Sequence, residues 1–262
     1  MTISYDTIET ATDRGIAVVR MNRPDVHNAF DDRLISELTV ELRRLEQAAE
    51  VRCVVLAANG KSFSAGADLN WMQRMAGYSE AENLRDAVAM AGLMRTLYGM
   101  RKPTVARVQG AAFGGGVGLV ACCDVAVAST EASFSLSEVR LGLIPSVISP
   151  YVIAAIGERQ ARRYFLTAER FGAEEARRIG LVHEVTGGDR LDQVVNEITA
   201  ALLKGGPHAL AAARTLIADV ARHPMDDALM EETARRIAAM RVAPEGREGL
   251  AAFLEKRKPG WL

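Results

Sequence analysis

Three consecutive glycines, Gly114, Gly115 and Gly116, lie between two apolar, strand-like runs at residues 104–109 and 125–129. We expect a strand that turns at these glycines and enters a short buried helix, with the glycines in its first turn. The first N–H groups of a helix have no partner within it, and the helix dipole adds partial positive charge there. Because glycine keeps side chains away, a phosphate, a carboxylate or a developing oxyanion can approach the bare backbone. The same glycines also suit a tight turn packed against a neighbouring backbone.

The size and charge of the chain restrict its class. Its 262 residues suffice for one large domain with a real core, and 49% hydrophobic residues are typical of globular proteins. Lys and Arg number 32 against 33 Asp and Glu, so the charge favours neither nucleic acid nor an anionic membrane as a partner. The N-terminus lacks the pattern of a signal peptide. The longest apolar window, residues 110–128, contains Asp124 and five glycines, which predicts a core segment rather than a membrane span.

The cysteines and histidines suggest no metal or nucleophile chemistry. Cys53, Cys122 and Cys123 have neither metal-ligand nor redox spacing. We expect buried, reduced thiols, as in a protein of the reducing cytoplasm. The four histidines give no catalytic pairing, and the Gly-x-Ser-x-Gly motif of serine hydrolases is absent. We therefore expect no metal site and no serine-hydrolase triad.

Apolar periodicity predicts strands that alternate with helices, followed by helices alone. This order favours βα units with a largely parallel sheet, and a helical tail that caps the domain or packs in another subunit. Ser79 and Glu82 match a capping box at the start of the helix expected at 79–100. Ser149 is expected as an N-cap before Pro150. Residues 62–69 are expected to form a loop. We expect strands at residues 15–21, 53–58, 104–109 and 125–129, a short helix or turn at 137–143, and helices at 31–49, 79–100, 150–156, 158–167, 173–179, 191–204, 208–222, 226–241 and 246–257.

Several stretches together resemble the crotonase superfamily, the enoyl-CoA hydratase/isomerase family. They are Arg23-Pro-Asp-Val-His-Asn-Ala-Phe30, Phe63-Ser-Ala-Gly-Ala-Asp-Leu69, Gly110-Ala-Ala-Phe-Gly-Gly-Gly116, Cys123-Asp124 and Phe134-Ser-Leu-Ser-Glu-Val-Arg-Leu-Gly-Leu143. The resemblance implies an α/β fold, a crotonase-like spiral of ββα units with a C-terminal helical oligomerisation region. It divides the chain into residues 1–190, the core with the CoA thioester site, and residues 191–262, for trimerisation and CoA contacts.

The resemblance also implies that the backbone N–H groups of Ala67 and Gly115 bind the oxygen of an acyl-CoA thioester. Adding or removing a proton beside a thioester puts negative charge on that oxygen, and two fixed donors stabilise the enolate. Losing one such donor typically costs about 3–4 kcal/mol of barrier. Because the donors belong to the backbone, small residues suit both positions.

The same resemblance places the acid/base at Glu138. Hydratases of the family use a second glutamate, at a position that is Gly118 here. One carboxylate can still move a proton between carbons, as the isomerases do, or hydrate a double bond if Glu138 and a backbone group hold the water. Desolvation beside a thioester would raise the pKa of Glu138, which suits a general acid/base. The missing side chain at Gly118 is expected to widen the pocket for a branched or longer acyl group.

Within the family, residues 117–124, 137–150 and 253–259 look most like the 3-methylglutaconyl-CoA and carboxygeranoyl-CoA hydratases of leucine and isoprenoid breakdown. Such substrates carry a distal carboxylate, which needs a cation. Arg74, Arg85 and Arg140 are the candidates, although each also suits an exposed surface position.

The resemblance implies no resident cofactor, since CoA enters as part of the substrate. A loop role for His27 and a solvated basic tail remain open alternatives to CoA binding. We expect a trimer or a dimer of trimers. The implied CoA contacts are His27, Ala29, Ala65, Ala67, Asp68 and Leu69, with Phe253, Lys256 and Lys258 contributed by a neighbouring subunit.

Three functions therefore remain open. The first is hydration of a 2-enoyl-CoA thioester, branched or carboxylated in its acyl group. The second is another reaction of the family, with Δ3,Δ2-enoyl-CoA isomerisation foremost. The third is a non-catalytic CoA- or RNA-binding scaffold, against which the lack of a basic stretch with interleaved aromatic residues argues.

Overall fold

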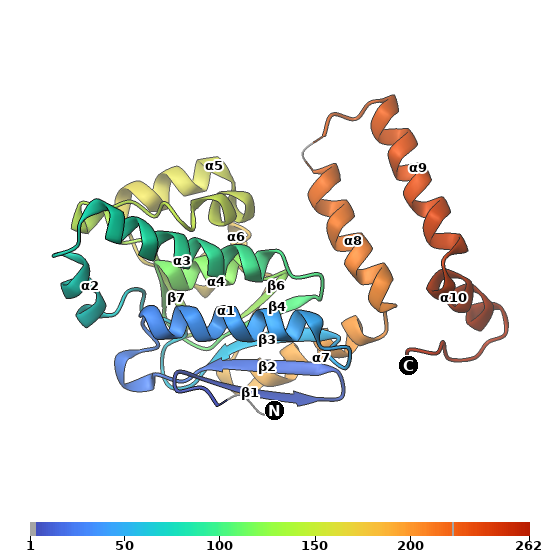
Figure 1. The fold of residues 1–262 in the computed structure, drawn as a ribbon, viewed down its shortest axis with the longest axis horizontal. Coiled ribbons are helices and arrows are strands. Elements are labelled where there is room, and N and C mark those ends of the chain that lie inside the picture. The colour runs from blue at the N-terminus through green and yellow to red at the C-terminus, as the bar shows by residue number, and fades with distance from the viewer. Residues whose placement is uncertain (1–3, 222) are drawn as a thin grey trace.

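The computed structural model describes residues 4–221 and 223–262, and a six-stranded sheet runs through it. The strand order is β1-β2-β3-β4-β6-β9 (Figure 1). β1 is antiparallel to β2, and every other neighbouring pair is parallel. The prediction of a largely parallel α/β sheet is therefore confirmed. The strands are β1 (Ile8–Asp13), β2 (Ile16–Met21), β3 (Cys53–Ala58), β4 (Thr104–Val108), β6 (Val125–Ser129) and β9 (Glu184–Thr186).

The helices lie mostly where apolar spacing predicts them. Ser79 and Glu82 form the predicted capping box of α3, and a break at Gly157 divides α5 into the two predicted segments. The expected N-cap at Ser149 is wrong, because the Ser149 hydroxyl donates to an upstream carbonyl and Ile148 occupies the N-cap position. The helices are α1 (Asp32–Gln47), α2 (Leu69–Met75), α3 (Glu80–Tyr98), α4 (Gly115–Cys122), α5 (Ser149–Thr167), α6 (Ala173–Arg178), α7 (Leu191–Leu203), α8 (Pro207–Val220), α9 (Asp227–Val242) and α10 (Pro244–Leu254).

Helices cover both faces of the sheet, which explains its apolar strands. All residues of β3 are buried, as expected for a parallel strand covered on both sides. Val55 of β3 belongs to a cluster with Leu191 and Val195 of α7. Its neighbour Leu56 points to the other face and joins a cluster that includes Leu38 of α1. Successive side chains of a strand alternate between faces, so β3 joins the two layers.

Several short elements are absent from the sequence-based prediction. They include β1, α2 and a small second sheet of order β5-β7-β8, formed by β5 (Ala112–Phe113), β7 (Ser133–Ser135) and β8 (Phe171–Gly172). β5 leads into α4, and β7 leads into the 3-10 helix η2 (Glu138–Leu141). The small sheet therefore places the starts of α4 and η2 close together.

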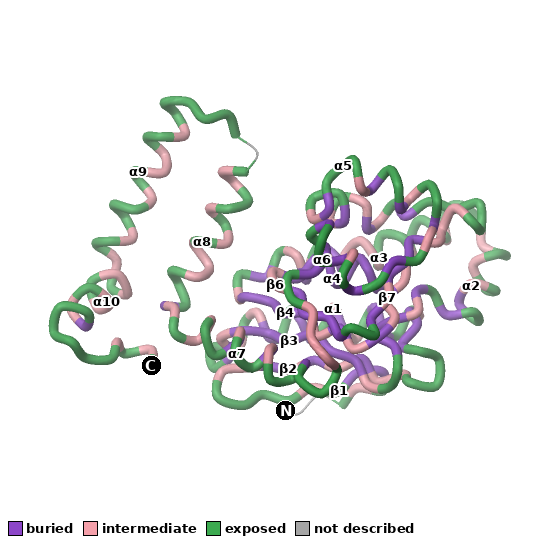
Figure 2. The backbone as a smooth tube through the Cα atoms, turned by 180° about the vertical axis from the view of Figure 1, so that it is seen from behind, coloured by how far each residue is buried: buried purple, intermediate pink, exposed green. Residues whose placement is uncertain are grey.

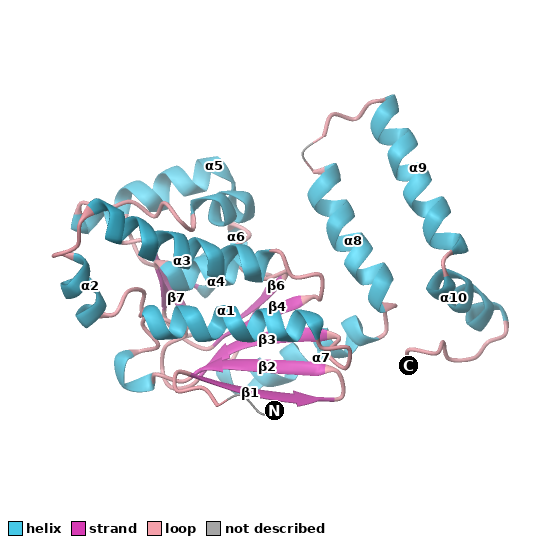
Figure 3. Ribbon diagram, in the orientation of Figure 1, coloured by secondary structure: helices cyan, strands magenta, loops and turns pink. Residues whose placement is uncertain are grey.

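Helices α8, α9 and α10 extend away from the sheet as an arm (Figures 1 and 3). Figure 2 shows that the arm is mostly exposed or half-buried, and Ala252 is the one buried residue within its described helices. Phe253 is 81% exposed. Helix α7 contacts β3, β4 and β6, so the chain leaves the sheet only after α7. The expected division into two regions at residue 191 stays a prediction. None of the described helices has the length and apolar composition of a membrane span.

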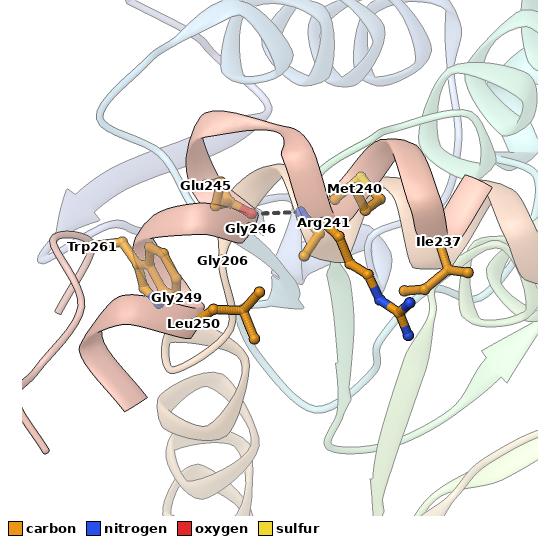
Figure 4. A pocket seen from close by; sticks show the side chains of 10 residues that line it. Gly206, Ile237, Met240, Arg241, Glu245, Gly246, Gly249, Leu250 and Trp261 are labelled. Atoms are coloured by element: carbon orange, nitrogen blue, oxygen red, sulfur yellow. Dashed lines mark hydrogen bonds between the residues drawn. The ribbon is translucent and has the colours of Figure 1, made fainter. Parts of the chain in front are cut away.

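The arm is held together by its own contacts. A pocket of about 370 Å³ lies where α8, α9 and α10 meet, with Trp261 on one side (Figure 4). Glu245 accepts hydrogen bonds from the backbone N–H groups of His208 and Ala209, at 3.0 and 2.8 Å. These groups belong to the first turn of α8, where negative charge is favourable. Arg52 fastens the junction with the core by donating to the Gly205 carbonyl at 2.6 Å.

Cys53, Cys122 and Cys123 are buried and form no disulfide, as predicted. Burial raises the pKa of Cys53 to about 11 and also raises the pKa of Cys122 and Cys123. Because the thiolate is the reactive form, these side chains behave as small apolar residues.

Candidate active site

The segments that carry Ala67 and Gly115 run side by side. Ser64 forms a parallel bridge with β5, in which the Phe113 N–H donates to the Ser64 carbonyl at 2.8 Å. A Cβ atom on Gly116 would lie 2.8 Å from the same carbonyl oxygen. Glycine is required there because any side chain would force the two segments apart.

Ala67 presents its N–H group to the space between these segments. The Phe30 N–H donates to the Gly66 carbonyl at 2.7 Å, and the Asp68 N–H donates to the Phe30 carbonyl at 2.9 Å. This parallel bridge uses the groups on either side of Ala67 and turns the Ala67 N–H away from Phe30. Ala67 is exposed, and its N–H has no acceptor among the described residues.

Gly115 provides a second unpaired N–H at the start of α4. Gly114 is the N-cap residue, with φ 49° and ψ −116°, a conformation that favours glycine. Its N–H donates to the Ser135 carbonyl, whereas no described residue accepts from the Gly115 N–H. A Cβ atom on Gly115 would lie 2.5 Å from the terminal methyl of Met90 and 2.9 Å from Phe30. The glycines therefore keep a helix N-terminus bare, as the sequence predicts.

Glu138, at the start of η2, turns its carboxyl group toward this N-terminus. A Cβ atom on Gly114 would lie 3.0 Å from Glu138 Oε1 and 4.0 Å from the Gly66 Cα. Glu138 Oε2 is buried without a hydrogen-bond partner in the described chain. Burial raises the pKa of Glu138, and a hydrogen bond from its own backbone N–H opposes part of that rise. The carboxyl group and the two loops thus meet around Gly114.

The expectation that Gly118 widens the pocket is wrong. Gly118 is buried in α4, and a Cβ atom there would lie 2.3 Å from the Cγ2 methyl of Ile148 and 3.3 Å from the methyl of Met94. Ile148 is itself 3% exposed. The side chain of Ile148 therefore occupies the space, and neither a second carboxylate nor extra acyl volume is found at this position.

A cavity lies elsewhere, between α2, α3, the end of η2 and the loop after it. Its volume is about 730 Å³. Met90 lines the cavity, and its methyl approaches Gly115, whose N–H group has no acceptor among the described residues. The sequence carries no local signal of this cavity, because its walls come from three separate stretches. The described lining residues are Trp71, Met72, Met75, Ala76, Asn83, Asp86, Ala87, Met90, Leu141, Leu143 and Val147.

The three arginines considered for a distal carboxylate do not line this cavity. Arg74 donates to Asp32 at 2.6 Å, and Arg85 and Arg140 are exposed. The described lining residues therefore provide no cation inside this cavity.

The core residues that are expected to contact CoA lie around the Ala67 loop. His27, in a left-handed conformation, accepts the Ala65 N–H at its carbonyl, and its Nδ1 lies 3.1 Å from the Ser62 hydroxyl. Ala29 is buried, and Leu69, the first residue of α2, is 76% exposed. These residues line one continuous loop region. The described chain contains no group of three or more His, Cys, Asp or Glu residues placed to hold a metal.

Phe253 and Lys256 do not join this region within one chain. Both are exposed, Phe253 in α10 and Lys256 just after it, whereas Leu69 opens α2, on the opposite side of the molecule from α10 (Figure 1). Their expected contact with CoA through a neighbouring subunit stays a prediction.

Arg23, the first residue of the Arg23–Phe30 motif, supports the Ala67 loop, a role that the sequence does not predict. Its guanidinium lies 3.0 Å from Asp68 and 2.8 Å from Asp31, and its side chain is 18% exposed. Asp31 is the N-cap of α1, and Asp68 is the N-cap of α2, accepting from the N–H groups of the first turn. Burial is the largest single effect on the pKa of Asp68 and would raise it. The hydrogen bonds from the α2 backbone and Arg23, together with the Arg23 charge, outweigh burial and lower the pKa. Arg23 thereby ties the residue after Ala67 to the core.

We expect Asp68→Ala to loosen the Ala67 loop. The change removes an N-cap, which costs about 1–2 kcal/mol, and leaves Arg23 with one carboxylate fewer. A displacement of the Ala67 N–H by about 1 Å would lower kcat by up to about 100-fold. Thermal unfolding and turnover of a 2-enoyl-CoA measure the two effects. Asp25→Ala, at an exposed acidic residue of the same region, is the matched control. A variant with wild-type kcat would separate Asp68 from the geometry of the loop.

Comparison with known proteins identifies the family of this chain. The profile of the enoyl-CoA hydratase/isomerase family matches residues 11–262. The chain belongs to the enoyl-CoA hydratase/isomerase family.

Individual relatives cover nearly the whole chain. The crystal structure of an enoyl-CoA hydratase from Shewanella pealeana ATCC 700345 is 45% identical, with a TM-score of 0.95 over 98% of this chain and 96% of that one. A crotonyl-CoA hydratase of Syntrophomonas wolfei subsp. wolfei is 30% identical over 99% of both chains. A 2,3-dehydroadipyl-CoA hydratase of Escherichia coli K12 is 31% identical over 93% of this chain and 94% of that protein. The crotonase-type fold expected from the sequence is confirmed.

Proposed function

We propose that this protein hydrates 2-enoyl-CoA thioesters, with the N–H groups of Ala67 and Gly115 as the oxyanion site and Glu138 as the acid/base. The observation that carries the proposal is the place of the Glu138 carboxyl group, beside the turn that begins at Gly114, with a buried, unpartnered oxygen. Hydratases acting on crotonyl-CoA and 2,3-dehydroadipyl-CoA are among the relatives, which supports the same class of reaction.

One carboxyl group suffices for the proposed sequence of steps. The Glu138 carboxylate takes a proton from water, and the resulting hydroxide adds to C3. The electron pair of the double bond moves toward the thioester oxygen, where the N–H groups of Ala67 and Gly115 stabilise the enolate. The protonated Glu138 then delivers its proton to C2, which restores the carboxylate and completes the addition of water.

The second candidate function is Δ3,Δ2-enoyl-CoA isomerisation. Ile148 fills the space beside Gly118, so no second carboxylate is found at that position, and moving a proton between C2 and C4 needs only one. Mass spectrometry separates the two reactions, because hydration adds the mass of water to the acyl-CoA and isomerisation conserves it. A product of unchanged mass from a 3-enoyl-CoA, with no hydration of crotonyl-CoA, would overturn the proposed function.

We expect kcat/KM to fall on acidification with an apparent pKa above 4.5, the ordinary value for glutamate. The proposed steps begin with the carboxylate, and below its pKa Glu138 is protonated and cannot accept the proton of water. Because burial raises the pKa of Glu138, activity is lost at a higher pH than an exposed glutamate would give. Crotonyl-CoA hydration measured from about pH 4 to pH 9 tests this. An acid limb at or below 4.5 would contradict it.

For the acyl group, the proposal is a branched substrate of the 3-methylglutaconyl-CoA type, as the resemblance of residues 117–124 and 137–150 suggests. The cavity lacks a cation among its described lining residues. We therefore propose that the neutral branch occupies the cavity and that any carboxylate points out of it. Hydration of crotonyl-CoA, 3-methylcrotonyl-CoA and 3-methylglutaconyl-CoA should be compared. A clear preference for crotonyl-CoA would remove the branched assignment.

We further propose that the arm joins a trimer or a dimer of trimers in the cytoplasm and brings Phe253 and Lys256 to the CoA of a neighbouring subunit. The exposed apolar residues of the arm, including Ile237, Leu250 and Phe253, support this. Light scattering coupled to gel filtration gives the mass. A monomer at micromolar concentration would exclude a shared CoA site.

A further inference from the structure

One hydrogen bond joins helices α2 and α3 at the wall of the acyl cavity. The indole N–H of Trp71, on α2, donates to Asp86 Oδ2, on α3, at 3.2 Å. Both side chains line the cavity, and Trp71 is 7% exposed. Asp86 is the one ionisable side chain among the described lining residues. The bond satisfies an indole N–H that would otherwise face an apolar space.

The position of this pair along α3 decides which part of a substrate it meets. Asp86 precedes Met90 by four residues, so the two share a helix face and lie about 6 Å apart along the axis. The Met90 methyl approaches Gly115, next to the site of the thioester oxygen. The Trp71 and Asp86 side chains therefore line the cavity about one turn of α3 away from Met90 and Gly115.

Trp71 is fixed at its backbone as well as at its ring. Its backbone N–H donates to Asp68, the N-cap of α2, at 3.2 Å. Asp68 follows Ala67 directly and is tied to Arg23. The indole is therefore held at a fixed position relative to the oxyanion site. A side chain that selects substrates by length needs such a fixed position.

We propose that Trp71, held by Asp86, limits the length of the acyl chain that the site accepts. The inference rests on the proposed use of this cavity for the acyl group of a 2-enoyl-CoA. The indole closes the cavity to longer chains, and its hydrogen bond to Asp86 keeps it from swinging aside. Trp71 is thus a specificity-determining residue, and Asp86 is a positioning residue that acts through it.

Kinetics over a chain-length series test the proposal. In Trp71→Ala, the ratio of kcat/KM for decenoyl-CoA to that for crotonyl-CoA should rise at least about tenfold, because each methylene newly buried is worth about fourfold. Asp86→Ala should raise the same ratio by about threefold by releasing the indole. Asp86→Asn keeps an oxygen acceptor for the indole N–H and should restore the wild-type ratio.

The outcomes separate the two hypotheses. If the wild type hydrates no enoyl-CoA of any length, the proposed function fails. If the wild type is active but Trp71→Ala keeps its length ratio, the chain-length inference alone is overturned. Loss of turnover at every length in a folded Asp86→Asn would make Asp86 an acid/base and would also overturn the inference.

A measurement on the intact wall guards against a Trp71→Ala variant that does not fold. The chain has two tryptophans, Trp71 and Trp261, and Trp261 lies in the arm. In a Trp261→Phe background, Trp71 is the only indole. Titration with saturated acyl-CoA thioesters should change its emission only when the chain is long enough to reach the wall. The same emission with acetyl-CoA and decanoyl-CoA would overturn the proposal.

Discussion

Replacing Glu138 by glutamine is expected to lower kcat for crotonyl-CoA hydration by about 10²–10⁴-fold, the usual contribution of a positioned acid/base. Glutamine keeps the shape of the side chain but cannot accept the proton of water. Steady-state kinetics should show the loss mainly in kcat, because the oxyanion donors are backbone groups that remain in place. Glu131→Gln, at an exposed glutamate shortly before it in the sequence, is the control. Turnover unchanged in Glu138→Gln would remove Glu138 from the mechanism and favour a binding scaffold.

The same variant should be more stable than the wild type near neutral pH. Burial raises the folded-state pKa of Glu138, so its favourable contribution to stability is present below the unfolded pKa and is lost as pH rises through the folded value. At pH 7 the ionised carboxylate therefore destabilises the fold, and glutamine removes that charge. We therefore expect a higher Tm for Glu138→Gln than for the wild type at pH 7, measured by thermal unfolding of both proteins. The difference should shrink on acidification; a constant difference would place its origin elsewhere.

A side chain at Gly118 is expected to be strongly destabilising. The Cβ atom of Gly118→Ala would lie 2.3 Å from the Cγ2 methyl of Ile148 and 2.9 Å from its Cβ, far inside contact distance. Both residues are buried, so the neighbours cannot move into solvent. Overpacking of a core costs about 1–3 kcal/mol and occasionally more, and we expect the upper end, a decrease in Tm of about 6–12 °C. Urea unfolding of the variant measures the free energy directly.

A double-mutant cycle identifies Ile148 as the cause. Ile148→Ala removes the offending methyl and should reduce the cost of Gly118→Ala, with a coupling of about 1–3 kcal/mol. Ile148→Val retains a methyl at the Cγ2 position and should not relieve the clash. Additive costs in the alanine cycle would mean that the space beside Gly118 is open, as the sequence alone suggested.

The long elements could be predicted because their apolar residues repeat at the period of one element. Leu34, Leu38, Leu42 and Leu45 recur along one face of α1, and all four are fully buried. By contrast, β5 has two residues, too few to show a period. It is a strand only because its backbone pairs with Ser64 and with β7. Helix α2 cannot be predicted in this way, because its seven residues are too few to show a helical period.

The residues of the candidate site also differ in whether the sequence alone predicts their role. The Gly114 turn could be predicted as a bare helix N-terminus from the glycines themselves, whereas the roles of Ala67 and Glu138 came from resemblance. Whether Gly118 leaves a void depends on Ile148, which lies far along the chain and contributes no local signal. Complementary volume between distant residues is invisible to periodicity, because any apolar side chain would fit the same pattern.

The burial of every cysteine gives this protein a practical property. Maleimides and other labelling reagents attack thiolates, and the raised pKa values of Cys53, Cys122 and Cys123 keep all three protonated. The native chain should therefore remain unmodified under conditions that label an exposed thiol. A single cysteine introduced at an exposed position such as Glu131 would carry one fluorophore at a known place, with no need to remove the native cysteines first.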